Sequence, residues 1–175
     1  MKERYVVDTN ILAGANAGNP METRKLDVTP KDPKLRKQIW EWLVSLQRSG
    51  SRIVVDIQGK IRTEYKPYIL PGSYSEQFMI AMNTSGRVDQ VWIQYDAHGY
   101  AILADTLECV HDDSDKKMIA SCLKAIEDYG SCIIAFAGDS DWHYWEDELI
   151  AHGVELEAII EEWSRAKYKE KSGNK

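Results

Sequence analysis

The chain has 175 residues, of which 43% are apolar and 29% charged, with a net charge of −6 and an isoelectric point near 5.3. This composition fits a globular chain that buries its own core, and it excludes low-complexity and disulfide-dense scaffolds. An acidic balance argues against a general nucleic-acid binder, whose surface is usually basic. It does not argue against an enzyme whose carboxylates gather around divalent cations.

The three cysteines, at positions 109, 122 and 132, form no CxxC pair, and their apolar neighbours indicate buried, reduced thiols. A zinc site at Cys109 and His111 has little support. The opening residues MKER do not resemble a signal peptide, and no apolar run approaches membrane-spanning length. We therefore expect a cytoplasmic protein with no membrane partner.

The first half of the chain alternates apolar runs with helical patterns. Asp32 followed by Pro33 is typical of a helix start, and Gly50 of a helix end. In chain order, the sequence predicts a strand at 4–7, a loop at 17–33, a helix at 33–49, a strand at 52–56, and helices at 57–66 and 73–84.

The second half has one ambiguous stretch, residues 87–110. Its core VWIQYDAHGYAIL fits either two short strands around an Asp-Ala-His-Gly turn or a broken helix. The later elements are predicted as a helix at 114–129, a strand at 132–137, a helix at 142–152, a strand at 154–156 and a helix at 157–168, with a polar, frayed tail at 169–175.

Strands that alternate with helices predict an α/β fold in one domain, residues 1–168, with a mainly parallel sheet covered by helices on both faces. The continuous apolar run CIIAFA at 132–137 is typical of a strand buried on both faces. Ligands of such sheets bind beyond the carboxyl ends of the strands. Asp8 and the GDSD segment at 138–141 are expected there.

Two of the acids near these strand ends have an ordinary structural interpretation. Asp8 or Asn10 is suited to cap a turn at 11–15, and Asp141 to cap the helix at 142–152. Asp139 precedes that helix in the same acidic segment.

Asp115 is harder to explain as a solvent-exposed acid. At the helical period it lies in the middle of an apolar stripe, formed by Met118, Ile119, Cys122 and Ile126. A buried, ionised carboxylate is unfavourable unless it is paired or bound to a metal. The alternative is a first-turn acid, favoured by the helix dipole and by a capping box with Asp112.

Glu64 poses the same problem in the helix expected at 57–66. It falls within a stripe made by Ile57, Ile61 and Tyr65. The alternative is a salt bridge to Lys60 or Arg62. If Asp8, Glu64, Asp115 and Asp139 converge, their mutual repulsion favours a bound divalent cation, and oxygen ligands favour Mg²⁺ or Mn²⁺ over zinc.

Three segments, in order along the chain, resemble parts of one nuclease family. VVDTNIL at 6–12 resembles its opening strand and first acid, DDSDKKMIASCLKA at 112–125 its third-acid helix, and CIIAFAGDSDW at 132–142 the strand and acidic turn that follow. Glu64 lies where the second acid belongs. The family is the PIN-like nuclease superfamily, and GDSDW followed by HYWEDELIAHGVEL is similar to its NYN branch.

The resemblance implies a three-layer α/β/α sandwich and a Mg²⁺- or Mn²⁺-dependent endoribonuclease that hydrolyses phosphodiester bonds, with RNA expected over DNA. The catalytic, metal-binding acids that it implies are Asp8, Glu64, Asp115 and Asp139, with Asp141 as a further ligand and Asp112 and Asp113 as alternatives for the third acid. Asn10 is assigned to a substrate phosphate or a water at the site. A homodimer and an antitoxin-like protein are partners that the family allows.

Substrate contacts have competing interpretations. Lys116 and Lys117 flank the expected site and are candidates for phosphate contacts, although solvated helix residues are the default. Aromatic residues after the acidic turn, at 142, 144 and 145, either stack on bases or pack in the core. A basic cluster at 24, 25, 31, 34, 36 and 37 is a candidate approach surface for nucleic acid.

Two other functions stay open. One is a phosphatase of the haloacid dehalogenase type with Asp8 as nucleophile, although the family's second Asp is replaced by Asn10. The other is a non-catalytic PIN-like scaffold or binding module.

Overall fold

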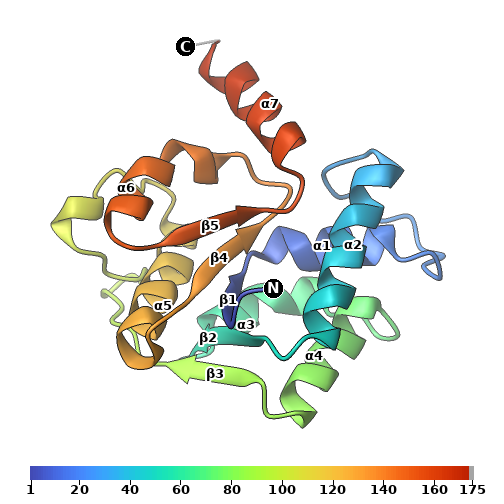
Figure 1. The fold of residues 1–175 in the computed structure, drawn as a ribbon, viewed down its shortest axis with the longest axis horizontal. Coiled ribbons are helices and arrows are strands. Elements are labelled where there is room, and N and C mark those ends of the chain that lie inside the picture. Colours follow the sequence, from blue (N-terminus) through green and yellow to red (C-terminus); the bar gives the residue numbers. More distant parts are fainter. Residues whose placement is uncertain (174–175) are drawn as a thin grey trace.

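A five-stranded parallel sheet forms the centre of the molecule, in the order β3-β2-β1-β4-β5 (Figure 1). The computed structural model describes residues 1–173. The strands are β1 (Arg4–Val7), β2 (Arg52–Asp56), β3 (Val88–Val91), β4 (Ile133–Phe136) and β5 (Glu155–Ala158). The chain builds outward from β1 through β2 to β3, then crosses to β4 and β5 on the other side of β1.

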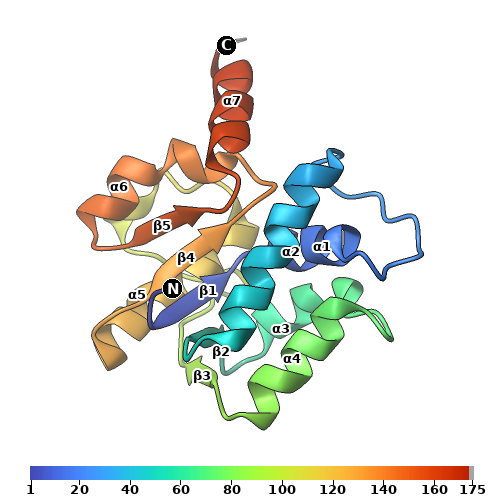
Figure 2. The same cartoon turned by 45° about the vertical axis from the view of Figure 1, so that its right-hand side comes forward.

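Helices cover both faces of this sheet, so the predicted α/β/α arrangement is confirmed. They are α1 (Thr9–Gly18), α2 (Pro33–Arg48), α3 (Lys60–Tyr65), α4 (Tyr74–Thr84), α5 (Asp113–Tyr129), α6 (Glu146–Ala151) and α7 (Glu161–Ser172). Helices α1, α2 and α4 lie on one face and α5 and α6 on the other, while α7 projects from the body (Figures 1 and 2). Short 3₁₀ turns are η1 (Lys66–Tyr68), η2 (Asp105–Leu107) and η3 (Asp141–Tyr144).

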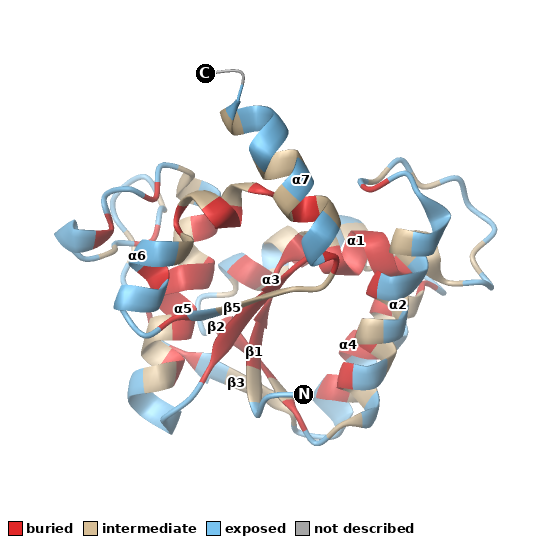
Figure 3. Ribbon diagram, turned by 45° about the horizontal axis from the view of Figure 1, so that its top comes forward, coloured by how far each residue is buried: buried red, intermediate tan, exposed pale blue. Residues whose placement is uncertain are grey.

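The core lies around the three central strands, which Figure 3 shows as the most deeply buried part of the sheet. All of β4 is buried, as the run CIIAFA predicted, and the last three residues of β1 are buried with it. The edge strands β3 and β5 are mostly half-buried. Burial of the central strands in this way fixes the positions of the strand ends.

Helix α1 differs from the sequence prediction, which is only a turn at 11–15 and a loop from residue 17. Its sequence TNILAGANAG is rich in small residues and has two glycines, which weaken helix propensity. Packing supplies the stability instead: a Cβ placed on Gly18 would lie 2.0 Å from the carbonyl oxygen of Arg36 in α2. The two helices therefore approach more closely than any larger residue allows.

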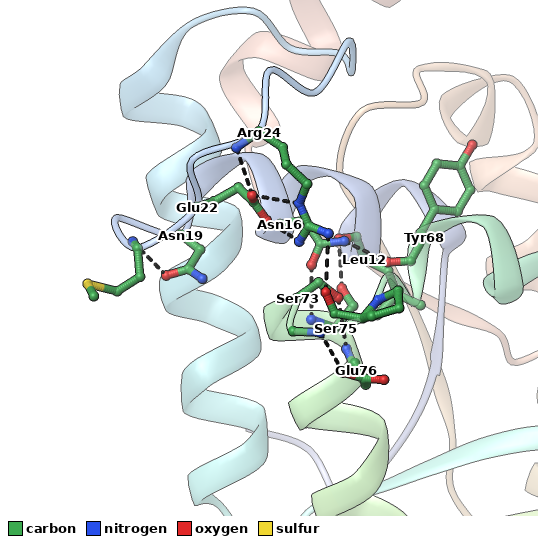
Figure 4. Close-up of polar contacts among 12 residues, drawn as sticks. Leu12, Asn16, Asn19, Glu22, Arg24, Tyr68, Ser73, Ser75 and Glu76 are labelled. Atoms are coloured by element: carbon green, nitrogen blue, oxygen red, sulfur yellow. Dashed lines mark hydrogen bonds and ion pairs between the residues drawn. The ribbon is translucent and has the colours of Figure 1, made fainter.

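Polar contacts join α1 to η1 and to the first turn of α4 (Figure 4). The Asn16 amide donates to the carbonyl of Tyr68 at 2.6 Å and accepts from the backbone N–H of Ser75 at 2.9 Å. The Ser75 hydroxyl donates to the carbonyl of Leu12 at 2.9 Å. These buried contacts hold the helix that begins directly after Asp8.

Several predicted boundaries were wrong. The helix expected at 57–66 begins at Lys60, because the buried Asp56 carboxylate accepts from the backbone N–H groups of Lys60 and Ile61. The helix expected at 142–152 is divided between η3 and α6. Residues 155–158 pair with β4 as a strand, so the last helix starts at 161 and runs to 172. Residues 169–172 are therefore helical rather than frayed, and 174–175 lie outside the described residues.

The ambiguous stretch 87–110 is closer to the two-strand prediction. It contains β3 and then an isolated antiparallel bridge between Tyr95 and Ala101, on either side of the Asp-Ala-His-Gly turn. Across the described part of the chain, no helix has both the length and the apolar character needed to span a membrane.

Candidate functional site

Two acidic segments lie side by side where the strand order changes direction. Strands β1 and β4 are parallel neighbours, with Val7 opposite Ala135. Asp8 follows β1 directly, and its backbone N–H donates to the carbonyl of Ala135 at 2.9 Å. The acidic turn of Asp139 follows β4. This switch point is the usual ligand position in an open parallel sheet.

Asp8 is 4% exposed and has a donor on each oxygen. Oδ1 accepts from the backbone N–H of Asn10 at 2.6 Å, so Asp8 does cap α1, and Oδ2 accepts from the indole N–H of Trp142 at 2.7 Å. Burial raises the pKa of Asp8 to about 6; the two hydrogen bonds limit the rise, and the charges of Asp139 and Glu64 add to it. One residue thus serves as a helix cap and as part of an acidic group.

Asp115 is the least compensated of these acids. It is 9% exposed, in the first turn of α5, and within residues 1–173 its carboxylate has no hydrogen bond or ion pair. Burial is the largest cause that raises the pKa of Asp115, to about 8. Four neighbouring carboxylates raise it further: Asp8, Asp112, Asp139 and Glu64.

The capping interpretation of this helix applies to Asp112 instead. The Asp112 carboxylate accepts from the backbone N–H of Ser114 at 2.8 Å and from its hydroxyl at 2.6 Å. Asp115 therefore has no capping contact of its own. Its burial agrees with the stripe that the sequence predicted.

Glu64 has partners other than the two that the salt-bridge alternative named. It accepts from the hydroxyl of Thr9 and pairs with Lys117 of α5, not with Lys60 or Arg62. Lys117 is thus bound to the acidic group itself. The stripe assigned to Glu64 was partly wrong, because Ile57 is exposed and precedes the helix.

The acidic turn after β4 is stabilised by a hydrogen bond within the turn and by an ion pair with α7. The backbone N–H of Asp141 donates to Asp139 Oδ1 at 2.8 Å, and burial raises the pKa of Asp139. Asp141 pairs with Lys171 at 2.5 Å. The expectation that Asp141 caps a helix at 142–152 is therefore wrong, because its side chain is bound to α7. Lys171 was missed because the tail was expected to fray.

The remaining predicted side chains are placed as follows. Lys116 pairs with Asp113 at 2.6 Å, while Asn10 follows Asp8 with its side chain half-buried. Trp142 and Trp145 are buried, so these two aromatics pack in the core. Trp142 was not predicted as a partner of Asp8; its position directly after GDSD was the only sequence signal.

The basic cluster at 24–37 is partly paired with acids of the same protein. Three of its members have carboxylate partners in the described structure: Arg24 with Glu22, Lys31 with Asp27 and Lys37 with Glu41. The Arg36 guanidinium donates to the carbonyls of Pro30 and Val28. For these four residues the contacts favour a structural role over an approach surface for nucleic acid.

The same loop packs on the acidic turn. A Cβ on Gly138 would lie 2.7 Å from the carbonyl oxygen of Thr29, so glycine permits this contact. The loop at 19–32 and the turn at 138–141 therefore support one another.

The chemistry of the four acids fits a hard divalent cation, because their donors are all carboxylate oxygens and Asp115 has no other partner in residues 1–173. The same described residues hold no group of three or more His, Cys, Asp or Glu side chains already arranged as a metal site. As the four acids lie in this structure, Glu64 is bound to Lys117 and Thr9. No protein-family model matches the chain, and searches of curated proteins and of solved structures find no similar protein.

Proposed function

We propose that this protein is a metal-dependent nuclease that hydrolyses phosphodiester bonds, with RNA as its substrate and Mg²⁺ or Mn²⁺ held by Asp8, Glu64, Asp115 and Asp139. One observation carries the proposal. Asp115 is a buried carboxylate without a partner in residues 1–173, and three other acids from separate elements raise its pKa.

The physical argument concerns charge. A buried carboxylate is unfavourable when ionised, and neighbours of the same charge make it more so. The raised pKa values of Asp8, Asp115 and Asp139 express this conflict. A divalent cation among the acids would offset this repulsion. It would therefore explain why the acids are clustered, which helix capping does not.

When bound, such a cation lowers the pKa of a water and offsets charge on the phosphate. The chain supplies the positioning. The Asn10 backbone N–H donates to one carboxylate oxygen of Asp8 and the Trp142 indole to the other. Each oxygen therefore keeps a further lone pair available. If Glu64 were to bind the cation in place of Lys117, the Lys117 ammonium would be available to a substrate phosphate.

Cleavage of single-stranded RNA with Mg²⁺ or Mn²⁺ tests the proposal. We expect Asp8→Asn and Asp115→Asn each to abolish cleavage while circular dichroism stays unchanged. Asp128→Asn is the matched control, because Asp128 lies at the other end of α5 and pairs there with Lys124. Cleavage that survives both site substitutions refutes the assignment.

Two further experiments separate the alternatives. A phosphatase with Asp8 as nucleophile is trapped by beryllium fluoride, whereas the nuclease is not. A scaffold has no reason to bind Mn²⁺ at these acids, so calorimetry with Mn²⁺ distinguishes it. Membership of the PIN-like superfamily, a homodimer, an antitoxin-like partner and a cytoplasmic location stay predictions.

A further inference from the structure

A surface pocket of about 280 Å³ adjoins the acidic group. The two share Glu64 and Lys117, which line the pocket and also belong to the site. Its opposite wall is made by Tyr95 and Tyr100, from the stretch that the sequence left ambiguous. A molecule that enters the pocket therefore lies directly beside the proposed site of cleavage.

The aromatic wall is built on a rigid turn. Asp96 Oδ1 accepts from the backbone N–H groups of His98 and Tyr100, at 2.8 and 2.9 Å. The backbone N–H of Asp96 donates to the carbonyl of Tyr100 at 2.9 Å, and Gly99 has a φ of +86°, which glycine adopts easily. These contacts fix the backbone at Tyr100, and the residue is 45% exposed.

A lysine completes the pocket. Lys60 Nζ lies 5.8 Å from the centroid of the Tyr95 ring, and it has no carboxylate partner within the described chain. A Cβ on Gly99 would lie 3.2 Å from the same Nζ, so the turn leaves room for the ammonium. The pocket therefore combines two aromatic side chains with an unpaired cation.

We propose that this pocket binds one nucleoside unit of the substrate, next to the phosphate that is cleaved. The base stacks against Tyr100, and Lys60 contacts the adjoining phosphate. Aromatic faces accept any base, so the expected preference is for a nucleotide over phosphate alone. The volume is near the lower end of small-ligand pockets, roughly 300 Å³, which suits one nucleoside and no longer segment. This inference rests on the proposed nuclease function and names where its substrate binds.

Binding of adenosine 5′-monophosphate, measured by calorimetry with a chelator present, tests the pocket independently of metal and catalysis. Inorganic phosphate is the second probe. We expect the nucleotide to bind more tightly than phosphate, and Tyr100→Ala and Lys60→Ala each to weaken it about ten-fold. Trp92→Ala is the control: Trp92 is 63% exposed but lies outside this pocket, so its loss leaves the affinity unchanged. Thermal unfolding of each variant verifies that it folds.

The inference is overturned if the wild-type protein binds no nucleotide at millimolar concentration, binds phosphate equally well, or is unaffected by Tyr100→Ala. RNA cleavage with Mn²⁺, measured in parallel, separates this failure from that of the proposed function. If the Tyr100→Ala variant cleaves RNA with an unchanged KM, the pocket proposal is wrong and the nuclease proposal stands. If nucleotide binding depends on Tyr100 but no RNA is cleaved, the pocket proposal stands and the nuclease proposal is wrong.

Discussion

At position 115 a carboxylate occupies part of a helix face that is otherwise apolar. Its ordinary pKa of 3.8 is raised to about 8 by burial and by neighbouring acids. Between these two values the unfolded chain binds fewer protons than the folded protein. The stability of the metal-free protein therefore falls as the pH rises from about 4 to about 8.

We expect Asp115→Asn to stabilise the metal-free protein at pH 8 by about 2 kcal/mol, since the amide has no charge to desolvate. At pH 4 both folded proteins are neutral at this position, so the difference should be small. Urea unfolding with a chelator present measures both values. Asp128→Asn controls for a general change in helix α5. Equal destabilisation at both pH values would contradict the account.

Trp142 shows how a structural residue is also tied to the site. The indole is fully buried, stacks edge-on against Trp145 and donates to Asp8. Its hydrogen bond lowers the pKa of Asp8 and so favours the charged form that binds a cation. Core packing and site geometry are therefore not separable at this residue.

At the scale of elements, α7 is joined to η3, to α6 and to the acidic turn by a few polar contacts. His143 Nε2 and Ser164 Oγ are 2.9 Å apart, and Arg165 pairs with Glu146 at 2.9 Å. Near the helix end, Lys171 pairs with Asp141. Helix α7 thus places the positive charge of Lys171 at the edge of the acidic group.

Removing this charge should strengthen cation binding. We expect Lys171→Met to tighten Mn²⁺ binding about three-fold in calorimetry, because an exposed ion pair has a modest effect and Lys171 competes for the acids. Lys169→Met is the control on the same helix, since Lys169 has no ion pair in residues 1–173. Weaker binding by Lys171→Met would show that the lysine supports the site instead.

The contact between α1 and α2 gives a prediction about packing. Gly18→Ala places a methyl group against the backbone of α2 and should destabilise the protein by about 2 kcal/mol or more. Gly50→Ala is the control, because a Cβ there meets nothing within 4 Å. Thermal unfolding compares the two. A Gly18→Ala protein as stable as the control would contradict the close approach.

For the molecule as a whole, the sequence predicted the parallel sheet and the burial of Asp115, because both leave local signals, whereas the nearness of Asp8 to the turn at 138–141 followed from the shared edge of parallel strands. A fully apolar run such as CIIAFA indicates burial on both faces, and an acid within an apolar stripe, such as Asp115, indicates a buried charge. These signals depend on burial alone, which periodicity reports directly.

The missed features depend on partners that periodicity does not report. Helix α1 is composed of poor helix formers and is stabilised by its contact with α2. The Trp142 bond to Asp8 and the Lys171 bond to Asp141 each join residues brought together by the tertiary fold. The basic cluster is similar, since Arg36 of α2 binds carbonyls of the preceding loop.

The central claim is that Asp8, Glu64, Asp115 and Asp139 share a divalent cation, and anomalous diffraction from Mn²⁺-soaked crystals tests it most directly. We predict one or two Mn²⁺ peaks within about 2.5 Å of carboxylate oxygens of Asp8, Asp115 and at least one of the other two acids, with Glu64 no longer paired to Lys117. Ordered Mn²⁺ only elsewhere on the protein, with Asp115 still lacking any partner, would contradict the account.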